Sequence, residues 1–314
     1  MHKKIVIMIL CSIMLIGCTT SNNKLKIDVI VKSTTSQFFK SVYSGANAAS
    51  KEYNIDLSFV GPENEEDYKS QIKMIENSIE NKADAIVLSS IDYNKLVEPV
   101  EKAVNEGIVV VIIDSDVNSD KVSVRITTNN FEAGKMAGNA AIDLNEKRKT
   151  IGIVNFDANT ANGQERENGF REALKNNKDI SNIYTINVQS NIESATKGTI
   201  QLLQEHPDIN VLATFNEWTT LGVGDAIREK HLMDDISVIA FDNNPISVEM
   251  LETGEIDALI VQNPFALGYL GVEEAFKILN GNKVLEESIY TKTVTITKKN
   301  MFETENQKIV FPFD

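Results

Sequence analysis

The stretch that decides the fold is Ile108 to Asn130, IVVVIIDSDVNSDKVSVRITTNN. It begins with a continuous apolar run that stops at Asp114, turns through Ser, Asp and Asn residues, and continues as an alternating strand over residues 122–127. A short apolar run with no polar side is typical of a parallel strand buried on both faces. A carboxylate that follows such a strand lies where open α/β sheets bind ligands. Asp114 alone decides nothing, because Asp also favours the turns that end strands.

Apolar runs that alternate with amphipathic segments fill the chain before this stretch. One helical stripe consists of Tyr68, Ile72, Ile75 and Ile79. Gly107 is placed to end a helix just before a strand. Such alternation is typical of βαβ units with a parallel sheet. The predicted strands are residues 27–31, 55–60, 85–88, 108–113 and 122–127.

The same alternation restarts after Asn130, with a helix predicted over residues 131–144. Gly134 and Gly138 lie one turn apart on this helix, so we expect another element to pack closely there. Two successive series of βα units predict an α/β protein with two doubly wound lobes. No linker separates the series, so the lobes are expected to exchange strands. The predicted strands of the second series are residues 151–156, 183–188, 211–215, 238–241 and 259–261.

Residues 1–17 have the features of a secretory signal, with two early lysines and an apolar stretch too short for a membrane span. Residues 15–18, LIGC, resemble the bacterial lipobox, so Cys18 is the predicted lipidation (palmitate) site and residues 18–24 a tether. The alternative is a cysteine that merely ends a cleavable signal. Because Cys11 leaves with the signal, the mature chain would have no disulfide. The predicted location is the outer face of the cytoplasmic membrane.

Acidic residues outnumber basic residues in the chain as a whole. The full sequence contains 45 acidic and 31 basic residues, and removal of residues 1–17 leaves 29 basic residues and a net charge near −16. Nucleic acids and anionic membrane surfaces bind basic faces, so neither is an expected partner, and the only predicted membrane contact is the lipid anchor. The remaining 297 residues are long enough for two domains, each with its own core.

Polar and aromatic residues gather where the predicted strands end. Lys32 follows the first strand, Phe38 and Phe39 open the first helix, and Arg166 lies in the loop or first turn before Gly169. The other residues that follow strands are Asp114, Asn216, Asp242 and Gln262. Each has an ordinary alternative as a surface charge, core residue, helix cap or turn former. Their shared position at strand ends favours a common cleft between the lobes.

This set of side chains suits a neutral polyol. Carboxylates accept hydrogen bonds from sugar hydroxyls, while guanidinium, ammonium and amide groups donate to sugar oxygens. Phe38 or Phe39 would cover the apolar face of a sugar ring. A phosphate or carboxylate ligand would instead require several cations and few acids.

The mature chain resembles periplasmic-type sugar-binding proteins of the ribose, arabinose and galactose group, the receptors of ABC importers. The segments that carry the resemblance are KSTTSQFF, IIDSDVNSDKVSVRITTNNFEAGKMAG, QERENGF, FNEWTTLG, AFDNNP and IVQNPFALGYLG. The resemblance implies the type I periplasmic binding protein fold, in which a three-crossing hinge joins the lobes. The predicted N-lobe is residues 25–127 with 263–293, and the predicted C-lobe is residues 128–262 with 294–314. The implied crossings lie near residues 127–129, 262–263 and 293–295.

The resemblance also implies roles for individual residues. Phe39 becomes the stacking ring with Phe38 beside it, and the hydrogen-bonding residues are Asp114, Arg166, Asn216, Asp242 and Gln262. Lys32 matches a lysine of arabinose-type and autoinducer-2-type receptors. Ser36 and Ser115 stand where ribose receptors have Asn and Arg, which disfavours ribose. Trp218 either replaces the second stacking ring or packs within a helix.

The predicted function is capture of a pentose or hexose and its delivery to an ABC permease, by a monomer without metal or cofactor. Autoinducer-2 is also a possible ligand. A sensory subunit that signals to a membrane histidine kinase is the alternative, and the sequence does not separate the two.

An enzyme is not expected, because the chain has no G-x-S-x-G motif, phosphate loop or G-x-G-x-x-G motif, and its mature histidines, His206 and His231, have no neighbouring candidate ligand. A carboxylate pair such as Asp114 and Asp242 could serve a glycosidase, but cations in the same cleft favour hydroxyl binding. The lipoprotein signal stands where a transcriptional repressor would need a DNA-binding domain.

Overall fold

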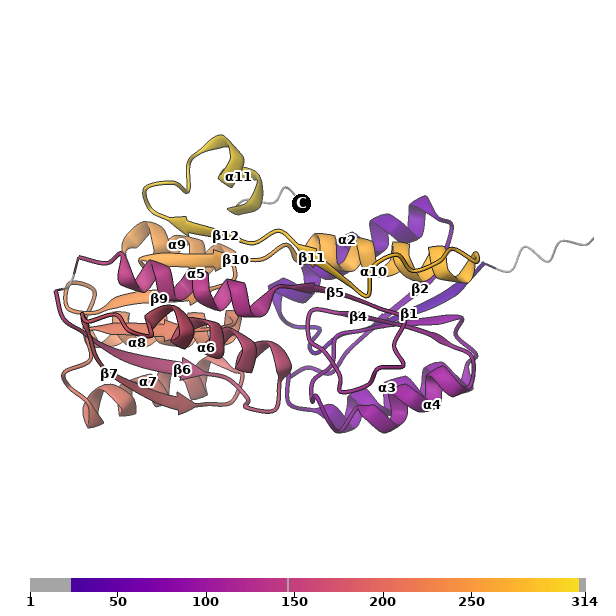
Figure 1. The fold of residues 1–314 in the computed structure, drawn as a ribbon, viewed down its shortest axis with the longest axis horizontal. Helices are drawn as coiled ribbons and strands as arrows, with labels where there is room; N and C mark the ends of the chain where they lie inside the picture. The colour runs from indigo at the N-terminus through magenta and orange to yellow at the C-terminus, as the bar shows by residue number, and fades with distance from the viewer. Residues whose placement is uncertain (1–23, 146, 311–314) are drawn as a thin grey trace, which may run out of the picture.

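A computed structural model describes residues 24–145 and 147–310. The described chain forms two lobes side by side, each built on a six-stranded sheet with helices on both faces (Figure 1). Residues 1–23 lie outside the described residues, and with them the predicted signal, Cys18 and most of the tether. No helix within the described ranges has the length and apolar character needed to cross a bilayer.

The first sheet has the strand order β11-β5-β4-β3-β1-β2, and all its pairings are parallel. Apolar clusters on both faces bury it against four helices. Its strands are β1 (Lys26–Ile30), β2 (Asp56–Val60), β3 (Ala85–Leu88), β4 (Val109–Ile113), β5 (Val124–Thr128) and β11 (Ser288–Thr291). The helices of this lobe are α2 (Gln37–Glu52), α3 (Tyr68–Glu80), α4 (Val97–Asn105) and α10 (Pro264–Leu279).

The second sheet repeats this plan with the order β12-β10-β9-β8-β6-β7. Its pairings are parallel except for the edge strand β12, which runs antiparallel to β10. The strands are β6 (Lys149–Asn155), β7 (Ile180–Asn187), β8 (Val211–Thr214), β9 (Ser237–Phe241), β10 (Ala258–Val261) and β12 (Val294–Thr297). The helices are α5 (Asn130–Ile142), α6 (Ala161–Leu174), α7 (Ile192–Glu205), α8 (Glu217–Lys230), α9 (Pro245–Thr253) and α11 (Thr304–Val310).

The structure confirms the predicted α/β architecture. Each of the ten predicted strands is present, with ends displaced by at most three residues. Gly107 ends α4 as expected, with a φ of 87° in the left-handed region. Gly134 and Gly138 do lie against another helix: a Cβ on Gly134 would stand 2.0 Å from the Arg166 carbonyl oxygen of α6.

The chain passes between the two sheets three times. It leaves the first sheet after Thr128, returns after Val261 and leaves again between Thr291 and Val294. Figure 1 shows the consequence: α10 and β11, late in the sequence, lie in the lobe that contains the N-terminal half of the chain. Each sheet therefore takes its last strand from the end of the chain.

Candidate functional site

The carboxyl ends of the parallel strands of both sheets face one small cavity between the lobes. Its volume is about 20 Å³, so the lobes must part to admit a ligand the size of a sugar ring. Twelve residues from both lobes line it: Lys32, Ser36, Phe38, Phe39, Glu65, Asp114, Asn162, Arg166, Asn216, Glu217, Asp242 and Gln262.

Nine of the eleven candidate ligand-binding residues line this cavity. Phe39 is also part of the apolar core of the first lobe, with Phe38 packed edge-to-face against it at 5.2 Å between ring centroids. Two candidates do not line the cavity. Ser115 is buried, and its hydroxyl has no hydrogen-bond partner within the described residues. Trp218 instead donates its indole N–H to Glu65 at 3.1 Å.

Asp114 and Asp242 occupy matching positions in the two lobes. Each follows a central strand in the left-handed region, with φ of 57° for Asp114 and 69° for Asp242. Each backbone N–H donates to the neighbouring strand, to Ile126 O at 3.1 Å and to Ile260 O at 3.0 Å respectively. Asp tolerates this conformation better than most residues, and it turns both carboxylates into the cavity.

Arg166 holds the floor of the cavity through a network of short hydrogen bonds. It is 1% exposed and donates to Asn130 Oδ1 at 2.9 Å, Phe215 O at 2.7 Å and Gln262 Oε1 at 2.7 Å. Gln262 in turn donates to Asp242 Oδ1 at 2.6 Å. The prediction that Arg166 lies in a loop or first turn is wrong, because α6 begins at Ala161 and places it in the second turn.

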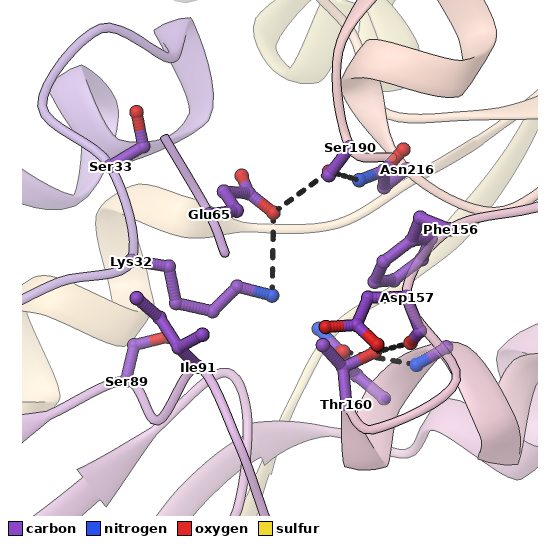
Figure 2. Close-up of polar contacts among 12 residues, drawn as sticks. Lys32, Ser33, Glu65, Ser89, Ile91, Phe156, Asp157, Thr160, Ser190 and Asn216 are labelled. Atoms are coloured by element: carbon purple, nitrogen blue, oxygen red, sulfur yellow. Dashed lines mark hydrogen bonds and ion pairs between the residues drawn. The ribbon is translucent and has the colours of Figure 1, made fainter. Parts of the chain in front are cut away.

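Lys32 points into the cleft from the end of β1 (Figure 2). Its ammonium forms an ion pair with Glu65 at 3.4 Å and lies 5.4 Å from the centroid of the Phe156 ring. Glu65 also accepts from Ser190 Oγ at 3.3 Å, and Ser190 Oγ accepts from Asn216 Nδ2 at 2.7 Å (Figure 2). A buried ammonium requires such a partner, because desolvation of an unpaired charge is costly.

The cavity combines four carboxylates with two cations. Lys32 is paired with Glu65. Burial raises the pKa of the Asp242 carboxyl to about 7, although the Arg166 charge and the hydrogen bond from Gln262 oppose the rise. Asp114 accepts from Ser89 Oγ at 2.7 Å and Asn162 Nδ2 at 3.2 Å. This excess of acceptors and negative charge suits a ligand rich in hydroxyl donors and disfavours an anion.

Three lining residues were not among the sequence candidates. Glu217 directly follows Asn216, so the strand-end signal that selected Asn216 covers it as well. Glu65 lies in the loop after β2. It is five residues beyond the strand end, and the intervening Gly61 and Pro62 make the path of the loop hard to predict from the sequence. Asn162 lies in the first turn of α6, and no sequence signal separates it from a helix-start residue.

A protein-family model described as "Periplasmic binding protein domain" matches residues 27–283. This chain belongs to that family. It is 29% identical over 269 residues to the D-ribose/D-allose-binding protein of Pseudomonas aeruginosa, an alignment that covers 82% of this chain and 83% of the relative. The comparison confirms the predicted family, and with it a binding protein rather than an enzyme.

Solved periplasmic binding proteins share the whole fold. An ABC transporter solute-binding protein from Agrobacterium vitis with bound D-fucose is 31% identical, with a TM-score of 0.87 over 91% of this chain and 100% of that chain. A sugar transporter from Clostridium phytofermentans is 33% identical, with a TM-score of 0.79 over 88% of this chain and 100% of that chain. These likenesses confirm the predicted type I fold.

Proposed function

We propose that this periplasmic binding protein captures a neutral monosaccharide between its lobes and delivers it to an ABC importer. The observation that carries the proposal is the convergence of nine predicted residues, from strand ends and from helices of both lobes, on one cavity. A ligand that contacts both lobes favours the closed form through its additional contacts, and the three passages between the sheets act as the hinge.

The composition of the cavity supports the ligand class. Asp114 and Asp242 provide acceptors for sugar hydroxyls, while Lys32 and Arg166 provide donors for ring and hydroxyl oxygens. Phe38, partly buried at the start of α2, offers a ring face to the apolar side of a sugar. Relatives named for ribose and allose, and a neighbour with bound D-fucose, support pentoses and hexoses as the first ligands to test.

A thermal-shift screen of the chain from Thr19 onward tests this function. The panel consists of pentoses, hexoses, deoxyhexoses and autoinducer-2, with the 5- and 6-phosphates and uronic acids of the same sugars as matched anionic controls. A ligand bound only by the folded state raises the melting temperature by mass action, so we expect a shift with a neutral sugar and none with its anionic counterparts. A shift with the anions alone would contradict the proposed ligand class, and no shift at all would contradict a monosaccharide ligand.

The partner and the anchor are further parts of this proposal. We propose a lipid anchor at Cys18 on the outer face of the cytoplasmic membrane, with the ABC permease as the partner of the sugar-bound form. The test is the ATPase activity of the genetically linked permease, reconstituted in liposomes. Sugar-dependent stimulation by the binding protein supports the importer, whereas kinase autophosphorylation without ATPase stimulation supports the sensory alternative.

A further inference from the structure

One group of hydrogen bonds joins the two lobes directly across the cleft, without a ligand. Glu217, the first residue of α8 in the second lobe, points its carboxylate at the start of α2 in the first lobe. Oε2 accepts from Ser36 Oγ at 2.6 Å and from Phe38 N at 3.1 Å, and Oε1 accepts from Gln37 N at 3.2 Å. Three donors of one lobe therefore converge on one carboxylate of the other.

The start of α2 needs these acceptors. The first N–H groups of a helix have no partner within it and carry a partial positive charge. Ser36 caps the N–H of Phe39 at 3.4 Å, which leaves those of Gln37 and Phe38 to Glu217. Within the second lobe, Asn244 Nδ2 donates to Glu217 Oε1 at 3.4 Å and helps to fix its position.

Because the Glu217 carboxylate is buried, leaving it without hydrogen-bond partners would cost free energy. Glu217 is 5% exposed, and burial raises its pKa despite the three opposing hydrogen bonds from the first lobe. If the lobes part, the carboxylate and the helix N–H groups must both find water instead. The contact is thus made in the closed arrangement and lost on opening.

We propose that Glu217 is a positioning residue that holds the first turn of α2 against the second lobe, so that closure is favoured by the protein before sugar adds its own contacts. This turn carries Phe38 and Phe39, so the same contact sets the place of the aromatic wall. The effect on sugar affinity rests on the proposed function, whereas the effect on closure does not.

Glu217 shares the cleft with other contacts between the lobes. Ser190 N donates to Glu66 Oε1 at 2.8 Å, Asn162 donates to Asp114, and Tyr93 N donates to Asn159 O at 3.1 Å. These remain when Glu217 is replaced. Loss of Glu217 is therefore expected to shift the population of closed molecules, without abolishing the closed form.

Distances between spin labels measure closure directly. The chain from Thr19 onward contains every described helix and strand and has no cysteine, so labels can be placed at Glu76→Cys on α3 and Gln201→Cys on α7. These helices lie on the side of the lobes away from the crossing strands, where opening separates them (Figure 1). Both positions are exposed.

Four variants without sugar test the proposal. Glu217→Ala and Ser36→Ala should both lengthen the distances, and the double variant should lengthen them no more than Glu217→Ala alone, because both changes break one contact. Glu217→Gln should have an intermediate effect, since its single carboxamide oxygen can still accept from Ser36 Oγ and Phe38 N, whereas its NH2 group cannot accept from Gln37 N. Glu193→Ala is the matched control: Glu193 lies in the first turn of α7, and among the residues that the structure describes it forms only an exposed ion pair with Lys197.

Titration with the sugar found by the screen completes the test. A reduced closed population raises Kd, and loss of charge-assisted hydrogen bonds of this kind predicts about a tenfold rise for Glu217→Ala. Unchanged distances in folded Glu217→Ala and Ser36→Ala would overturn the proposal, even with weaker binding, because Glu217 would then act only as a ligand contact. If no sugar binds, the proposed function fails while the distances still decide this inference.

Discussion

At Asp114, the backbone requires a residue that tolerates a left-handed conformation, and the side chain is proposed to accept hydrogen bonds from the sugar. Its left-handed φ makes Asp114→Ala a mixed test, because Ala adds backbone strain of about 1 kcal/mol to the loss of the acceptor. Asp114→Asn retains tolerance of this conformation but loses the charge and half of the acceptor capacity. We expect a loss of about 2 to 4 kcal/mol in sugar affinity for Asp114→Ala and a somewhat smaller loss for Asp114→Asn.

Calorimetric titration and urea unfolding of both variants separate the two effects. Asp114→Gly controls for the backbone, because Gly adopts the left-handed region without strain. Wild-type sugar affinity in Asp114→Asn and Asp114→Gly would remove Asp114 from the binding site.

Asp242 predicts how stability depends on pH. Its pKa rises from the ordinary value of 3.8 to about 7 in the folded protein, so the folded state binds a proton that the unfolded state has lost. This contribution is fully present below pH 3.8 and disappears as the pH rises through about 7. The shift corresponds to a few kcal/mol, roughly 4.

The measurement is the difference in unfolding free energy between wild type and Asp242→Asn, from urea titrations at pH 4.5 to 8. Asn cannot ionise, so we expect wild type to lose stability relative to the variant as the pH rises. A difference that is independent of pH would mean that the carboxyl keeps its ordinary pKa.

At the scale of elements, the contact between α5 and α6 links stability to the cleft. A Cβ on Gly134 would meet the Arg166 carbonyl, and a Cβ on Gly169 would meet Phe131 O at 2.0 Å, so the two helices touch backbone to backbone. Gly134→Ala must push α6 away and displace Arg166. We expect a loss of about 1 to 3 kcal/mol in stability, together with weaker sugar binding.

Asn139→Ala is the control on the same helix, because Asn139 is exposed and Ala favours helices. Denaturation midpoints and sugar Kd values of both variants provide the test. Stability equal to that of wild type in Gly134→Ala would show that the helices can separate without cost.

The elements that the sequence predicts best are those with the simplest pattern. The apolar run that ends at Asp114 is a strand buried on both sides, and the strand-end rule brings Lys32 and Gln262 to the same cavity from opposite lobes. The rule fails for Glu65 because its place depends on the path of a loop. Strands β11 and β12 are as short as β3, β8 and β10 but lack a continuous apolar run, and their partners lie far away in the sequence.

At the scale of the whole molecule, Cys18 decides where the protein is held. Replacement by Ser removes the thiol that would carry the lipid, so Cys18→Ser is expected to release the protein from the membrane fraction. Fractionation of cells with immunoblotting measures this. Cys11→Ser is the control, since it lies inside the predicted signal and should leave the anchored product unchanged. Membrane association of Cys18→Ser through a retained signal would show that the lipobox interpretation is incomplete, whereas release of wild type and variant alike would contradict it.

The return of the chain end to both sheets also bears on when the protein can fold. Strand β11 completes the first sheet only after residue 291 has been synthesised, and β12 completes the second only after residue 297. A growing chain therefore lacks one outer strand of each sheet for nearly all of its synthesis, and pairing over such long sequence separations is slow. We therefore expect the nascent protein to stay incompletely folded until its last residues emerge, as passage through a translocation channel for unfolded chains requires.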